Sequence, residues 1–139
     1  MGKDTVKTAL SVVEKCAVTL IGSVDAEGYP NTKAMLPPRE HDGLKEFYFT
    51  TNTSSMRVKQ YIKNPKASIY FFDPMSFLGV MLKGKMEVLQ DQPTKERIWR
   101  KGDTMYYAKG VTDPDYCVLK FTADSGRIYQ NFNSEDFKV

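Results

Sequence analysis

The sequence has few of the side chains on which most enzyme active sites and metal sites depend. Its 139 residues include one histidine, His41, and two cysteines, Cys16 and Cys117. The cysteines lack the spacing of metal ligands and are too few for a disulfide framework. We therefore expect a reduced, cytoplasmic protein without a metal site. His41 falls in a predicted turn, where a solvated histidine is far more common than a general base.

Long apolar runs and phosphate-binding motifs are also missing. No apolar run is long enough to span a bilayer and no charged-then-apolar leader is evident, so we expect no membrane association. There is no glycine-rich phosphate loop followed by Lys-Ser/Thr, no Gly-x-Gly-x-x-Gly and no His-Glu-x-x-His. The catalytic residues are unknown from the sequence. If the chain is an enzyme, a bound cofactor supplies the reactivity.

Charge of neither sign dominates the chain. There are 20 Lys and Arg residues against 17 Asp and Glu, and the two kinds are interleaved. A nucleic-acid-binding barrel would need a concentrated basic face, so we expect no nucleic-acid partner. Aromatic residues make up 12% of the chain, which suits a β-rich core, a site for a flat ring or a dimer face. The length predicts one domain, residues 1–139.

Apolar periodicity and turn residues predict six or seven strands with helices between them. The predicted strands are 17–24, 30–36, 46–51, 67–72, 77–89, 116–121 and 127–132. The predicted helices begin at Asp4, at Thr53-Ser54-Ser55 and at Asp91, with a further helical turn near Met105. Turns are expected at 25–28, 41–43 and 124–126, and the polar tail from Asn133 is expected to be loose.

The order of these elements predicts the fold class. Short turns join consecutive strands, as in an antiparallel sheet, and Gly84 inside the longest strand predicts a bulge or bend. Helices interrupt the strands at intervals. We therefore expect an α+β fold, with an antiparallel six- to seven-stranded barrel or strongly curved sheet and flanking helices.

One segment predicts an anion site. Thr53, Ser54 and Ser55 cluster where a helix begins after a strand, and Arg57 falls in its first turn. A helix N-terminus has unpaired N–H groups and a partial positive charge, so hydroxyls and an arginine at this end can hold a phosphate. On this segment alone, an ordinary N-cap with a solvated arginine is the favoured explanation of the same residues.

Several segments in the same order resemble the pyridoxamine 5′-phosphate oxidase-like flavoproteins, and most closely their small bacterial general stress protein branch. These are split-barrel proteins that bind flavin mononucleotide (FMN). The resemblance extends to about Tyr129. It rests on the hairpin Asp25-Ala26-Glu27-Gly28-Tyr29-Pro30, on Lys33-Ala34-Met35, on strand 47–51, on Ser55-Met56-Arg57, on Asn64-Pro65, on strand 80–89 with Asp91, on Trp99 and on Asp113-Pro114-Asp115-Tyr116.

The resemblance implies an antiparallel split β-barrel and a set of FMN-binding residues. Ser55 and Arg57 would hold the phosphate of FMN with help from Lys33. Backbone groups at Ala34 and Met35 would face the polar edge of the isoalloxazine ring. The ribityl chain and one ring edge would be lined by Phe49, Thr50, Thr51 and Ser54. The resemblance also implies a homodimer with flavin sites at the interface and a small-molecule electron donor or acceptor.

Three departures from the family pattern bear on function. Lys33 stands where arginine is common, and Arg57 stands where lysine is common. Both positive charges are kept, but the planar two-point donor and the point charge have changed places. Gly79 lies near the position of a flavin-contacting glutamine in the true oxidases, and their substrate-binding segment is not evident at 127–132. Pyridoxamine phosphate is therefore not the expected substrate. The family also has haem-binding and deazaflavin-using members, so the fold does not fix the cofactor.

Two hypotheses of different classes follow. The first is an FMN-dependent, stress-related oxidoreductase in which the flavin transfers hydride or electrons. The alternative is a non-enzymatic module that binds or stores flavin or another planar cofactor. The absence of catalytic side chains fits both.

Overall fold

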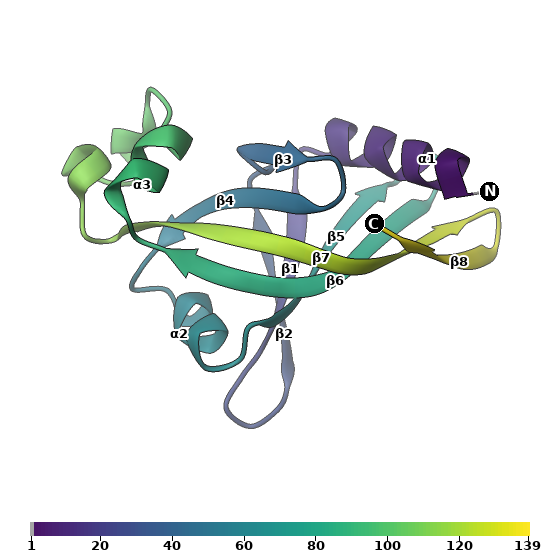
Figure 1. Cartoon of the computed structure of the whole chain (residues 1–139), viewed down its shortest axis with the longest axis horizontal. Coiled ribbons are helices and arrows are strands. Elements are labelled where there is room, and N and C mark those ends of the chain that lie inside the picture. Colours follow the sequence, from purple (N-terminus) through teal and green to yellow (C-terminus); the bar gives the residue numbers. More distant parts are fainter. Residues whose placement is uncertain (1) are drawn as a thin grey trace.

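The computed structural model describes residues 2–139, with three α-helices and eight strands in this part of the chain (Figure 1). The helices are α1 (Gly2–Lys15), α2 (Met56–Lys63) and α3 (Gln92–Ile98), and two short 3-10 helices, η1 (Asp103–Met105) and η2 (Gly110–Thr112), follow α3. The strands are β1 (Thr19–Val24), β2 (Pro30–Met35), β3 (Glu40–Asp42), β4 (Glu46–Asn52), β5 (Lys66–Asp73), β6 (Leu78–Leu89), β7 (Tyr116–Gln130) and β8 (Asn133–Lys138).

The strands form one antiparallel sheet that does not close on itself. Its order is β2-β1-β5-β6-β7-β4-β3, with β8 paired to β7 outside this path. Strands β2 and β3 therefore lie at the two edges of the curved sheet. In Figure 1, α1 lies beside the end of the sheet that carries β8, whereas α3 lies at the opposite end of β7. The predicted α+β split barrel with flanking helices is confirmed.

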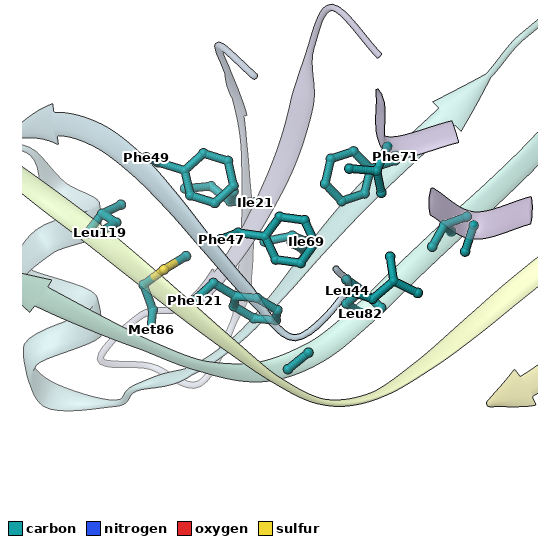
Figure 2. Close-up of a cluster of buried hydrophobic side chains, with 14 of the residues drawn as sticks. Ile21, Leu44, Phe47, Phe49, Ile69, Phe71, Leu82, Met86, Leu119 and Phe121 are labelled. Atoms are coloured by element: carbon teal, nitrogen blue, oxygen red, sulfur yellow. The ribbon is translucent and has the colours of Figure 1, made fainter. Parts of the chain in front are cut away.

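The core fills the concave side of the sheet. Residues alternate between the two faces of a strand, and β4 shows this alternation with Phe47 and Phe49 fully buried. Figure 2 shows these rings between side chains of β1, β5, β6 and β7. The ring centroid of Phe47 lies 5.7 Å from that of Phe71 and 6.3 Å from that of Phe121. This cluster fixes the register of β4, which carries part of the site described below.

The bulge predicted at Gly84 is confirmed. The β6–β7 register shifts between Lys83 and Gly84. An added Cβ at Gly84 would lie 1.9 Å from the backbone oxygen of Thr122, so β7 approaches here more closely than any side chain allows. The bulge bends the two longest strands and contributes to the curvature of the sheet.

The turn predicted at 124–126 and the loose tail predicted from Asn133 are wrong. Strand β7 runs through 124–126 without a break, and the tail forms β8. Gly126 resembles a turn residue, but it is needed because a Cβ there would lie 2.4 Å from the ring of Phe137 in β8. The glycine therefore makes room for a long-range contact.

Two smaller predictions also need correction. Residues 40–42 form the edge strand β3 because they pair with β4, where His41 lies opposite Phe47 and its ring stacks on the Phe47 ring at 5.6 Å. Helix α1 includes Asp4 in its first turn and so begins before the predicted cap. Among residues 2–139, every helix is too short or too polar to cross a lipid bilayer.

The convex face of the sheet carries a group of aromatic residues, which we call the outer aromatic cluster: Tyr70, Phe72, Phe77 and Tyr129. The ring centroids of Tyr70 and Phe72 are 6.4 Å apart, those of Phe72 and Phe77 5.0 Å, and those of Phe77 and Tyr129 6.3 Å. Phe77 is 65% exposed. A solvated sheet face is normally polar, so this face departs from the usual pattern.

Candidate functional site

A cavity of about 280 Å³ lies between strand β2 and the end of β4. We call it the β2–β4 cavity. Since β2 is one edge of the sheet and β4 neighbours the other edge, the cavity lies at the opening of the barrel. Its lining residues are Lys33, Ala34, Met35, Leu36, Pro37, Arg39, Thr50, Thr51, Asn52, Arg57, Tyr106 and Tyr107.

Six of the nine predicted site residues line this one cavity: Lys33, Ala34, Met35, Thr50, Thr51 and Arg57. They come from three separate elements, β2, β4 and α2. Strand β2 pairs only with β1, so in residues 2–139 its second edge has backbone N–H and C=O groups without a strand partner. Such groups can bind a polar ring edge placed beside Ala34 and Met35.

Helix α2 holds Arg57 at the cavity because adjacent positions of the helix are anchored to the barrel. Val58 and Tyr61 are buried, and the Tyr61 hydroxyl donates to the Gly22 carbonyl oxygen at 2.9 Å. Arg57 Nε is buried and has no hydrogen-bond partner in the described part of the chain. Neither Arg57 nor Lys33 forms an ion pair within residues 2–139. A buried donor without a partner is costly, so this site is suited to an anion.

Ser55 is the N-cap of α2. Its hydroxyl oxygen accepts the N–H of Val58 at 3.3 Å, which is the local role that the sequence offered as an alternative. Ser55 is not among the residues that line the cavity. The hydroxyl hydrogen remains available, so the capping role and a contact to an anion are compatible.

Ser54 and Phe49 lie outside the cavity lining as well. The N–H of Ser54 donates to Asp115 Oδ1 at 2.8 Å, so this donor is already used within the protein. Phe49 is 1% exposed and belongs to the core, as Figure 2 shows, and it lies opposite Leu119 in the β4–β7 pair. The Phe49 side chain therefore positions Thr50 and Thr51 without itself lining the cavity.

The structure adds an aromatic wall to the cavity. Tyr106 and Tyr107, which follow η1, line the cavity opposite the strands. The sequence offered Trp99 and the Met105-Tyr106-Tyr107 region as a cover for the site, but favoured a core or dimer contact for these residues. Burial raises the pKa of Tyr107 above its usual value, and the neighbouring Thr50 hydroxyl opposes this shift. The sequence signal was the aromatic pair after Gly102, for which core packing was the favoured explanation.

Arg39 is a further lining residue, and the sequence did not assign it to the site. Its guanidinium forms a two-point ion pair with Asp103, with Nη1–Oδ2 and Nη2–Oδ1 distances of 2.8 Å. Only 8% of the Arg39 side chain and 6% of the Asp103 side chain are exposed. This pair attaches the segment that carries Tyr106 and Tyr107 to the chain after β2. The charge of Arg39 is thus neutralised, and Lys33 and Arg57 are the cations available to a ligand.

The residues with other reactive side chains lie elsewhere. His41 Nδ1 lies 2.9 Å from the Gly43 carbonyl oxygen, and the side chain is on the exposed edge strand β3 and not in the predicted turn. Both cysteines are free, and burial raises the pKa of each thiol. In residues 2–139 no group of three or more His, Cys, Asp or Glu side chains could hold a metal ion. The cavity is therefore a binding site without an obvious nucleophile of its own.

An open antiparallel barrel with a cationic cavity at its opening defines a class of small α+β split-barrel proteins. A sequence profile described as pyridoxamine 5′-phosphate oxidase matches residues 5–130. The chain therefore belongs to the pyridoxamine 5′-phosphate oxidase family, and the predicted family is confirmed.

Similar proteins agree with this membership. The pyridoxine/pyridoxamine 5′-phosphate oxidase of Pseudomonas paraeruginosa is 37% identical over 91 residues, which cover 64% of this chain and 40% of that protein. The chain thus spans less than half the length of that relative.

Two solved structures are similar over nearly the whole chain. A Clostridium acetobutylicum protein, related to general stress protein 26 of B. subtilis and of the pyridoxinephosphate oxidase family, has a TM-score of 0.91 and 39% identity. That comparison covers 100% of this chain and 97% of the other. A pyridoxamine 5′-phosphate oxidase-related, FMN binding protein of Nostoc punctiforme has a TM-score of 0.74 at 13% identity, covering 99% and 96% of the two chains. At such low identity the second likeness shows the fold alone.

Proposed function

We propose that residues 1–139 form a single FMN-binding domain that acts as a stress-related oxidoreductase, with FMN in the β2–β4 cavity. The observation that carries this proposal is the buried, unpartnered Nε of Arg57 at the N-terminus of α2. Family membership supports the choice of a flavin, and the relation of a similar protein to general stress protein 26 supports the link to stress. Cytoplasmic location remains a prediction.

The residues of the cavity fit the parts of FMN. Arg57 and Lys33 supply two cations and several donors for a phosphate. The free backbone edge of β2 at Ala34 and Met35 offers donors and acceptors for the polar edge of a ring system. The hydroxyls of Thr50 and Thr51 can meet the hydroxyls of the ribityl chain. When bound, FMN would supply hydride or electron transfer, and the chain would orient it and limit access of water.

Tyr106 and Tyr107 restrict access to the cavity. Tyr107 is 4% exposed and packs in a small hydrophobic cluster, whereas Tyr106 is 52% exposed. The other buried members of this cluster are Ile98, Tyr116 and Val118. A fixed inner ring and a freer outer ring form a wall that can exclude bulk water from one side of a bound ligand. The small-molecule electron donor or acceptor would approach beside Tyr106.

A second copy of this chain is the proposed partner, with flavin sites at the dimer interface. The cavity of about 280 Å³ in one chain is slightly smaller than the 300–1,000 Å³ that is typical of ligand sites. A wall from another chain would complete it. The outer aromatic cluster supplies an apolar face on each copy for this contact.

Pyridoxamine phosphate is not the proposed substrate. An added Cβ at Gly79 would lie 2.0 Å from the Tyr70 hydroxyl, so the phenol of Tyr70 fills the space that a longer side chain would need. The flavin-contacting glutamine of the true oxidases therefore has no equivalent here. The chain also covers only 40% of the length of the Pseudomonas paraeruginosa enzyme.

A non-enzymatic flavin-binding module is the second candidate, and the composition of the cavity fits it as well as it fits the oxidoreductase. Its lining, as far as the structure describes the chain, contains no carboxylate, histidine or cysteine. Anaerobic stopped-flow mixing of the FMN complex with NADH or NADPH distinguishes the two candidates. Bleaching of the flavin absorbance within seconds supports the oxidoreductase, and no bleaching with either donor supports the module.

The absorbance spectrum of the protein after incubation with FMN and desalting tests the site. Wild type should retain flavin bands. Arg57→Ala should weaken FMN binding about tenfold to a hundredfold, because a charge-assisted hydrogen bond contributes about 1.5–3 kcal/mol. Lys59→Ala, an exposed cation in the same helix, is the matched control and should bind FMN as wild type does. Equal FMN affinity of Arg57→Ala and wild type would show that the site is assigned wrongly.

A further inference from the structure

One carboxylate from the loop before the neighbouring strand β7 holds the turn that precedes α2. Asp115 Oδ1 accepts the N–H of Ser54 at 2.8 Å, and Asp115 Oδ2 accepts the side-chain amide of Asn52 at 3.0 Å. The backbone oxygen of Asp115 also accepts the N–H of Thr53 at 2.7 Å. Three consecutive residues of the turn are therefore bonded to a single residue at the start of β7.

Asp115 is itself held by buried contacts. Its N–H donates to Asp113 Oδ1 at 2.9 Å, and the N–H of Lys109 donates to Asp113 Oδ2 at 3.1 Å. Lys95, which is 5% exposed, donates from Nζ to the Asp113 backbone oxygen at 3.0 Å. A buried lysine in α3 thus fixes the loop that presents Asp115. The position of the turn before α2 is therefore set by contacts to Asp115, and through Asp113 by Lys95.

The hydrogen bonds to Asp115 determine which donors of the turn remain. The N–H groups of Thr53 and Ser54 are used by Asp115. Arg57 Nε, in the first turn of α2, is buried and has no partner within residues 2–139. The N–H donors of the turn are therefore used, and the unpartnered donor at the cavity belongs to Arg57. An arriving anion would meet a turn that is already fixed.

We propose that Asp115 is a positioning residue for the phosphate end of the cavity, so that it governs the preference for FMN over riboflavin. The inference rests on the proposed function, because it names a determinant of ligand choice at the same site. Asp115 holds residues 52–54, which come directly before the helical turn that carries Arg57. In residues 2–139 the one lining residue to which the Asp115 side chain is hydrogen bonded is Asn52, and the Asp115 side chain forms no hydrogen bond to Ala34, Met35 or Tyr107. Its loss should therefore reduce binding of the phosphate and leave the binding of the ring unchanged.

The charge state of Asp115 agrees with this role. Hydrogen bonds from Ser54 and Asn52 lower the pKa of Asp115 below its usual value, so the carboxylate is ionised at neutral pH. An ionised acceptor forms stronger bonds to N–H donors than a neutral one. These bonds also satisfy the carboxylate within the protein, which reduces its repulsion of a nearby phosphate.

Titration of the full chain with FMN and with riboflavin, followed by flavin fluorescence, tests the proposal. In Asp115→Ala the dissociation constant for FMN should rise about tenfold or more, and that for riboflavin should change less than about twofold. Asp115→Asn should recover most of the FMN affinity, because its amide oxygen can still accept the Ser54 N–H. Asp91→Ala, which removes an aspartate that caps α3 through Thr94, is the control and should leave the ratio unchanged.

Each outcome has a distinct meaning. An equal loss of FMN and riboflavin affinity in Asp115→Ala would overturn the proposal, because it would indicate a general structural role. Unchanged FMN affinity in both Asp115 variants would overturn it as well, while the proposed function would stand. A wild type that binds neither flavin would refute the proposed function itself and this inference with it. If Asp115→Ala does not fold, a wild-type FMN to riboflavin ratio in Asn52→Ala would refute the proposal.

Discussion

Arg39 and Asp103 show how a single ion pair can organise a site wall. Burial alone would raise the pKa of Asp103, but hydrogen bonds from the Arg39 guanidinium and the Arg100 N–H outweigh it and hold the pKa below its usual value. A carboxyl whose folded pKa is depressed stabilises the protein above its unfolded pKa. That contribution is lost as pH falls through the folded pKa. The pair is therefore a source of stability at neutral pH that fails in acid.

Asp103→Asn should lower the free energy of unfolding by about 3 kcal/mol at pH 7, because it leaves the buried Arg39 without a counter-charge. The difference from wild type should stay constant down to about pH 5 and shrink below about pH 4. Urea denaturation followed by the fluorescence of Trp99, which packs against Tyr116 and Tyr107, measures it.

Asp136→Asn is the matched control for this prediction. It breaks the exposed Arg127–Asp136 ion pair and should change stability very little. A difference between Asp103→Asn and wild type that is as large at pH 3 as at pH 7 would contradict the electrostatic explanation. The loss would then come from packing alone.

At the scale of elements, the β6–β7 pair depends on the bulge at Gly84. Gly84→Ala should lower the free energy of unfolding by about 2–3 kcal/mol, because the new methyl would collide with the Thr122 backbone of a neighbouring strand. Gly79→Ala should cost less, since its collision is with the end of the half-buried Tyr70 side chain, which can move. Thermal or urea denaturation compares the two. Equal losses would show that the close backbone approach at Gly84 is not the cause.

Local signals predicted most elements but missed contacts made by distant residues. The strands and helices that flank the cavity were predicted because turn residues and apolar alternation are local. Strand β8 was missed because its hydrogen bonds to β7 and the burial of Phe137 are tertiary contacts. The same reason explains Gly126, which resembled a turn residue until its contact with Phe137 was seen.

The candidate site was also predicted only in part: the residues that line the cavity were mostly found, and the contacts that position them were missed. Residues on β2, β4 and α2 were found because the resemblance placed them in order along the chain. Arg39 and Asp115 were missed in their roles because their partners, Asp103 and Ser54, are 64 and 61 residues away in sequence. A resemblance to a family identifies the positions that match the family's motifs. The contacts of Arg39 and Asp115 depend instead on how distant parts of this chain pack together.

At the scale of the whole molecule, we expect the outer aromatic cluster to hold two copies of the chain together, and we expect a substitution in it to weaken this dimer. Phe77 is exposed and has a φ of 49°, a conformation that aspartate tolerates better than phenylalanine. Phe77→Asp should therefore fold normally and raise the dimer dissociation constant about tenfold or more. Sedimentation velocity at several concentrations measures the change.

Ile62→Lys is the control for the dimer prediction. Ile62 is 66% exposed on α2, away from the outer aromatic cluster, and a lysine suits the C-terminal end of that helix. It should leave the sedimentation of the protein unchanged. A wild type that sediments as a monomer at all concentrations would refute the proposed interface.

The open edge of β2 has a consequence for the solubility of the protein. An unpaired edge strand can recruit strands of other chains and so start aggregation, and charged side chains on such an edge oppose this. Lys33 is exposed on that edge, between Thr32 and Ala34. The lysine that can attract a phosphate to the opening of the barrel also discourages fibril-like pairing there. Selection for a soluble protein and selection for an anionic ligand therefore favour the same side chain.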